Sequence, residues 1–123
     1  MEKRRAPLAL YHILDAIADL RSILGERAVE EIAADRTRRY AAERCVEIIS
    51  EASRRIPEDW KAEYPSVPWI EIAAIGNILR HHYEDVDLAI IVELCGRHLG
   101  DLERVTEALL DKYDPEGRPF RRR

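Results

Sequence analysis

Four stretches of this chain carry apolar residues at intervals of three and four positions. This spacing places side chains on one stripe of an α-helix, whereas a strand would need alternation. The stretches cover about 7–24, 35–56, 68–80 and 87–113. In the first, the large apolar residues are Leu10, Ile13, Leu14, Ile17, Leu20 and Leu24. Long amphipathic helices with short connections predict an all-α fold, an up-and-down four-helix bundle.

Helix boundaries in the first half are indicated by capping residues. Pro7 suits the first turn of a helix, and Gly25 suits a C-terminal cap. We expect residues 26–34 to form a short connector helix. Asp35 is a good N-cap for the second long helix, which should end near Ile56.

Prolines divide the second half of the chain. Residues 57–67 are expected to form a loop, and the third helix should begin near Pro68. Gly76 inside that helix costs about 1 kcal/mol relative to alanine. We therefore expect close approach of another element there, most simply tight helix packing. Asp87 is expected to cap one continuous final helix that ends near Tyr113.

Size and charge limit the class of protein. The 123 residues, 46% hydrophobic, fit one domain over 1–113, followed by a flexible basic tail over 114–123. The net charge of −4 argues against nucleic-acid binding by a broad basic surface. Cys45 and Cys95 lie in apolar helical patterns and are expected to be reduced core thiols. Neither a leader nor a membrane span is evident, so we expect a cytoplasmic protein with no membrane partner.

The run from Gly76 to Tyr83, GNILRHHY, holds the most reactive side chains of the chain. Histidine exchanges protons near neutral pH, and arginine stabilises a phosphate. Asn77 and His81 are four residues apart, so an intact helix presents both on one face. With Arg80 for charge and His81 for proton transfer, these are the parts of a metal-free ribonuclease that forms a 2′,3′-cyclic phosphate.

Simpler explanations exist for the same residues. Adjacent histidines at a helix end are commonly a capping or surface feature, and His81 and His82 lack the partners of a metal site. The hydroxyl of Tyr83 could equally be bonded to backbone.

Charged residues of the second helix have their own alternatives. Its arginines alternate with acids, as on a solvated helix face; they are Arg36, Arg38, Arg39 and Arg44. Glu51, at the edge of the apolar stripe, either pairs with an arginine of the third helix or lies near a cleft.

Several segments together resemble the HepT-like branch of the HEPN superfamily. The resemblance spans about residues 8–112 and rests on Glu51-Ala52, Tyr64-Pro65-Ser66-Val67-Pro68-Trp69, Gly76-Asn77-x-Leu79-x-His81-x-Tyr83 and Val86-Asp87. It implies a helical-bundle toxin of a toxin–antitoxin pair, a homodimer whose cleft cuts RNA without metal or cofactor. The implied partner is an MntA-type minimal nucleotidyltransferase antitoxin.

The family motif is Arg, four to six residues, His, any residue, Tyr. Carried over, its histidine is His81, and its tyrosine, which the antitoxin can modify with AMP, is Tyr83. Asn77 would bind RNA or support the site. The position of the motif arginine holds Gly76, so Arg80 is the candidate for its charge. Two hypotheses follow: a ribonuclease toxin that uses Arg80 and His81, or a non-catalytic binding partner of the nucleotidyltransferase.

Overall fold

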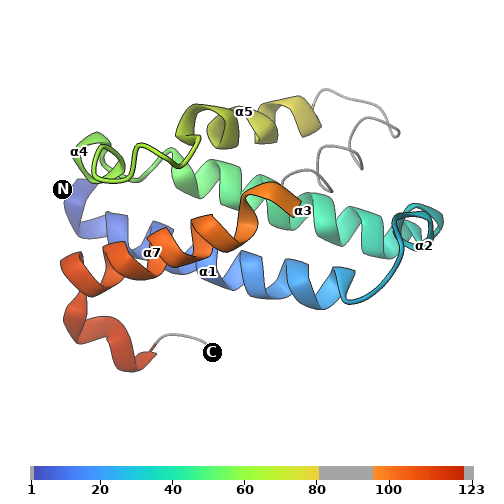
Figure 1. Ribbon diagram of the computed structural model, residues 1–123, viewed down its shortest axis with the longest axis horizontal. Coiled ribbons are helices and arrows are strands. Elements are labelled where there is room, and N and C mark those ends of the chain that lie inside the picture. The colour runs from blue at the N-terminus through green and yellow to red at the C-terminus, as the bar shows by residue number, and fades with distance from the viewer. Residues whose placement is uncertain (1, 81–95, 121–123) are drawn as a thin grey trace.

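The computed structural model describes residues 2–80 and 96–120, and within these ranges it is helical with no strand (Figure 1). The long helices are α1 (Glu2–Leu24), α3 (Arg36–Ser53), α5 (Trp69–Arg80) and α7 (Leu99–Tyr113). The short ones are α2 (Val29–Ala34), α4 (Glu58–Lys61) and the 3₁₀ helix η1 (Pro115–Phe120). The predicted all-α bundle is confirmed, including its connector helix.

Helix α3 lies at the centre of the described bundle. It packs against α1 on one side and α5 on the other, while α7 lies against α1 (Figure 1). The stripe predicted for α1 forms the core: Leu10, Ile13, Ile17 and Leu20 are completely buried. Burial of each such side chain contributes about 2 kcal/mol. Helix α7 adds Leu102, Val105, Leu109 and Leu110 to the same core.

Two predicted helix starts agree with the structure. Asp35 caps α3, its Oδ1 accepting a hydrogen bond from the backbone N–H of Arg38 at 3.2 Å. Helix α5 begins at Trp69, directly after Pro68. Both follow from local chemistry, since a carboxylate satisfies an orphan N–H and proline suits a helix start.

Three boundaries were predicted wrongly. Helix α1 begins at Glu2, so Pro7 lies inside it instead of at its start. Residues 57–67 are not all loop, because α4 forms there. The last helix is not continuous: His98 is a turn residue with φ −120°, and α7 starts after it. Gly96 and Gly100 flank that turn and lower the helix propensity around it.

Aromatic side chains tie the α4 region to the bundle. The rings of Trp60 and Tyr113 are stacked, with centroids 3.9 Å apart. The indole N–H of Trp69 donates to the carbonyls of Tyr64 at 3.1 Å and Lys61 at 3.2 Å. These contacts fix the start of α5 against the preceding segment.

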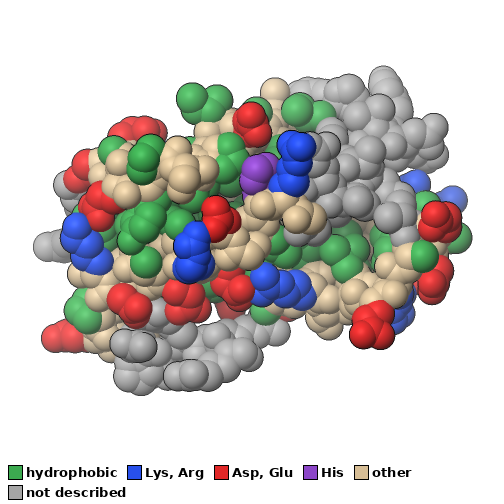
Figure 2. All heavy atoms as spheres, in the orientation of Figure 1, with side chains coloured by type: hydrophobic (Ala, Val, Ile, Leu, Met, Phe, Trp, Pro, Cys, Tyr) green, Lys and Arg blue, Asp and Glu red, His purple; other side chains and the backbone are tan. Residues whose placement is uncertain are grey.

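Directly after the predicted domain boundary at Tyr113, the chain forms η1. The Tyr11 hydroxyl donates to Oδ2 of Asp114 at 2.8 Å, which joins this end of the chain to α1. None of the described helices is long and apolar enough to cross a membrane. On the face seen in Figure 2, basic side chains lie among acidic ones.

Candidate functional site

Helix α5 carries the first half of the run singled out in the sequence. It ends at Arg80, the residue before His81. Asn77 is exposed on this helix, whereas Leu79 is buried with 8% of its surface accessible. The predicted catalytic His81 and the predicted modification residue Tyr83 lie outside the described residues, as do His82 and Asp87. What the structure describes at this site is therefore the packing of α5 against the rest of the bundle.

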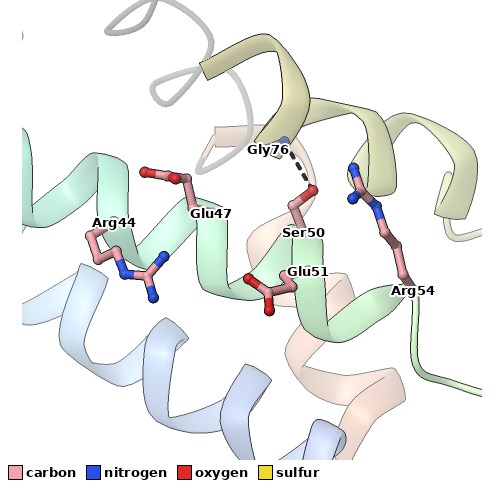
Figure 3. A pocket seen from close by; sticks show the side chains of 6 residues that line it. All are labelled: Arg44, Glu47, Ser50, Glu51, Arg54 and Gly76. Carbon is pink, nitrogen blue, oxygen red and sulfur yellow. Dashed lines mark hydrogen bonds between the residues drawn. The ribbon is translucent and has the colours of Figure 1, made fainter. Parts of the chain in front are cut away.

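Ser50 of α3 joins the two helices through their backbones. Its hydroxyl, 1% exposed, donates to the carbonyl of Ala73 at 2.9 Å and accepts from the N–H of Gly76, also at 2.9 Å (Figure 3). One buried side chain thus satisfies a donor and an acceptor three residues apart on α5. This fixes the helix along its axis as well as around it.

Gly76 is required by the closeness of this contact. A Cβ built at Gly76 would lie 2.8 Å from Oγ of Ser50, closer than real Cβ atoms come, and 3.0 Å from its Cβ, tighter than most real contacts. The expectation that another element approaches closely at Gly76 is confirmed. Any residue larger than glycine at this position requires displacement of α5 from α3.

Arg54 provides a second set of hydrogen bonds to α5. Its Nε and Nη2 donate to the carbonyl of Ala73, at 3.1 Å and 2.5 Å. A charged donor strengthens such bonds. Together, Ser50 and Arg54 set the position from which the chain continues to His81.

A small polar hollow lies between α3 and α5 beside these contacts. Its volume is about 140 Å³ (Figure 3). It is lined by Arg44, Glu47, Ser50, Glu51, Arg54 and Gly76. The hollow opens next to Gly76.

A second hollow of about 290 Å³ lies between α1 and α3. Its lining residues are His12, Arg44, Ile48, Glu51, Ala52 and Arg55. Arg44 and Glu51 line both hollows, so the two are neighbours along α3. Glu51 pairs with Arg55, just after the end of α3, at 3.0 Å. The expectation that Glu51 lies near a cleft is confirmed, because it lines both hollows.

The arginines of α3 differ in their partners. Arg38 pairs with Asp35 at 3.0 Å, as expected for a solvated face with alternating charges. Arg39 and Glu43 approach to 3.6 Å, but both side chains are largely buried, so the expected solvated face does not extend to this pair. Arg44 is exposed and makes no ion pair or hydrogen bond with any described residue. Sequence reasoning grouped it with the others and missed its place at both hollows.

Cys45, predicted to be a reduced core thiol, is free and buried. Burial raises the pKa of its thiol above the ordinary value of 9.0, and the Asp19 carboxylate acts in the same direction. Cys95 lies outside the described residues. Within 2–80 and 96–120, no three histidine, cysteine, aspartate or glutamate side chains form a group that could hold a metal ion.

Comparison with known proteins gives consistent matches along most of the chain. The family model described as Ribonuclease HepT-like matches residues 13–109. The Methanocaldococcus jannaschii protein named "Putative RNase MJ1216" is 30% identical over 118 residues, 96% of each chain. "Putative RNase MJ1380" of the same organism is 32% identical over 107 residues, 87% of this chain and 98% of that one.

"Probable ribonuclease HepT" of Thermococcus cleftensis is 35% identical over 82 residues, which cover 67% of this chain and 74% of that protein. No solved structure matches. The family model covers far more than half of the sequence, and the matched residues run from α1 to α7. The chain therefore belongs to the HepT-like ribonuclease family of the HEPN superfamily.

Proposed function

We propose that this protein is a metal-independent endoribonuclease and the toxin of a toxin–antitoxin pair. The observation that carries the proposal is the fixing of α5 by Ser50 and Arg54 at a polar hollow, directly before His81. A catalytic histidine needs such a rigid support, because small displacements from productive geometry are costly in rate. Membership of a ribonuclease family supplies the reaction class.

In the proposed reaction, the RNA 2′-hydroxyl attacks the adjacent phosphorus and the bond from phosphorus to the 5′-oxygen breaks. The products are a 2′,3′-cyclic phosphate and a 5′-hydroxyl. His81 assists transfer of the proton from the attacking hydroxyl toward the leaving oxygen, and Arg80 balances the negative charge on the phosphorane. Asn77 supports the substrate from the exposed side of α5.

A homodimer is part of the proposal. The outward side of α5 is apolar: Ile70 is 87% exposed and Ile78 is 37% exposed. With Ala74 between them, these side chains form one stripe at intervals of four residues, about 12 Å long. Two copies related by a twofold axis through Ala74 would place Ile70 of one copy near Ile78 of the other, which is the self-complementary contact of a symmetric dimer.

The proposed regulator is an MntA-type nucleotidyltransferase antitoxin. We infer that it silences the ribonuclease by transfer of AMP to the Tyr83 hydroxyl, two residues after His81. An added nucleotide would bring a phosphate and bulk to the cleft, where they would exclude RNA by charge and by volume. The AMP transfer to Tyr83 is inferred from the resemblance of the sequence motif to that of the family.

A second function has one specific observation in its favour. Gly76 stands at the motif arginine position, and its contact with Ser50 leaves no room for a side chain. A protein that lost this arginine could serve as a non-catalytic binding partner of the nucleotidyltransferase. In that case the cleft would bind the partner and cut no RNA.

Growth after induced expression separates the two functions. Wild type and His81→Ala are expressed at matched level without a partner. The ribonuclease proposal predicts arrest by wild type and growth with His81→Ala. Normal growth with both proteins, each soluble, would favour the non-catalytic function.

A further inference from the structure

We propose that Arg44 binds a phosphate of the RNA, on a track that runs along α3 between the two hollows. This inference rests on the proposed function, because it assigns the RNA path at that same site. Arg44 is the basic residue common to the two hollows, one beside α5 and one beside α1. A strand that leaves the cleft at the end of α5 and passes along α3 would meet it.

The neighbouring arginines are already engaged. Arg54 is turned toward α5 (Figure 3), where it donates twice to the Ala73 carbonyl. Arg55 pairs with Glu51. Arg44 makes no such bond to any residue in 2–80 or 96–120, and its guanidinium lies on the α1 side of α3 (Figure 3). Five donors are thus available to an external anion.

The charge around this track differs in sign from that of the whole chain. The two hollows are lined by three arginines and two glutamates, against a net charge of −4 for the protein. One of those glutamates, Glu51, is neutralised by Arg55. A local positive excess on an acidic protein favours an anionic ligand at this groove over an apolar or basic one, and RNA is the anion that the proposed function supplies.

Arg44 shares the α5-side hollow with Gly76, the residue at the motif arginine position. The Arg44 guanidinium is turned toward α1 and away from Gly76, so it does not occupy the place of the motif arginine (Figure 3). An arginine can bind a phosphate through two parallel hydrogen bonds. Arg44 therefore contributes to binding of the substrate.

The test measures the salt dependence of RNA affinity. The probe is a fluorescein-labelled, single-stranded, fully 2′-O-methylated oligonucleotide, which wild type cannot cut because the attacking hydroxyl is blocked. Fluorescence anisotropy gives Kd across a series of KCl concentrations. Each phosphate contact to a single strand contributes about 0.7 to the slope of log affinity against log salt.

Arg44→Gln is expected to weaken binding several-fold at low salt and to reduce the slope by about 0.7. Arg44→Lys, which keeps a point charge, should restore the slope. The matched control is Arg36→Gln, which removes an equally exposed arginine about 12 Å away on α3 that lines neither hollow. Its slope should equal that of wild type.

Equal slopes for Arg44→Gln and Arg36→Gln, whether both reduced or both unchanged, would overturn the assignment, as would absence of binding by wild type. Circular dichroism melts show that each variant is folded. Failure of the proposed function has a different signature: wild type binds the methylated strand with an Arg44-dependent slope but leaves the unmodified strand uncut.

Discussion

Replacement of Gly76 by alanine tests the packing that positions α5. The added Cβ would lie 2.8 Å from Oγ and 3.0 Å from Cβ of Ser50. Ser50 is 1% exposed and cannot swing into solvent, so the helices must separate. Overpacking of this kind costs about 1–3 kcal/mol, and disturbance of the Gly76 to Ser50 hydrogen bond costs about 1 kcal/mol more.

Alanine also gains about 1 kcal/mol of helix propensity over glycine. The net expectation for Gly76→Ala is a loss of about 2 kcal/mol in the free energy of unfolding, measured by urea denaturation. Gly100→Ala is the control, because a Cβ there meets no described atom within 4 Å. That variant should be unchanged or more stable by up to about 1 kcal/mol.

A double-mutant cycle identifies Ser50 as the cause. Ser50→Gly removes both atoms that the new Cβ would strike, so Gly76→Ala should cost nothing when added to it. If Gly76→Ala is as stable as wild type, or if its cost persists in the Ser50→Gly background, the packing argument is refuted.

Three further outcomes are expected. Because burial raises the Cys45 pKa in the folded state, this thiol's contribution to stability is present below pH 9.0 and falls as pH rises above it. In urea titrations, the excess stability of wild type over Cys45→Ala should therefore shrink above pH 9.0, and a constant difference would contradict this. Ile70→Lys should shift the protein from dimer to monomer in light scattering, whereas Arg104→Gln, an exposed change on α7, should leave the dimer intact. If Ile70→Lys is still a dimer, the α5 stripe is not the dimer interface. Tyr83→Phe should remain toxic in the presence of the nucleotidyltransferase, and full neutralisation would reject Tyr83 as its target.

The sequence was sufficient for the bundle because apolar periodicity reflects burial directly. The stripe of Leu10, Ile13, Ile17 and Leu20 is the core of α1, and Asp35 caps α3 as its side chain allows. Helix boundaries were harder to predict, since helix propensity and packing together decide whether a helix continues through Pro7 or His98. Neither residue alone determines whether a helix continues.

The candidate site was predictable in part. The cost of glycine inside a helix pointed to close packing at Gly76, which the Ser50 contact explains. Ser50 itself could not be found from spacing, because its partners are backbone atoms of another helix. Arg44 could not be distinguished from Arg38 by sequence, since both alternate with acids. Only the placement of their partners in three dimensions separates them.

The central claim is tested most directly by incubation of purified protein with a defined single-stranded RNA in the presence of EDTA. Wild type should cut the RNA and leave 2′,3′-cyclic phosphate and 5′-hydroxyl ends, identified by mass spectrometry. His81→Ala, folded to the same extent, should leave it intact. Intact RNA with wild type, or equal cutting by both proteins, would contradict a His81-dependent ribonuclease.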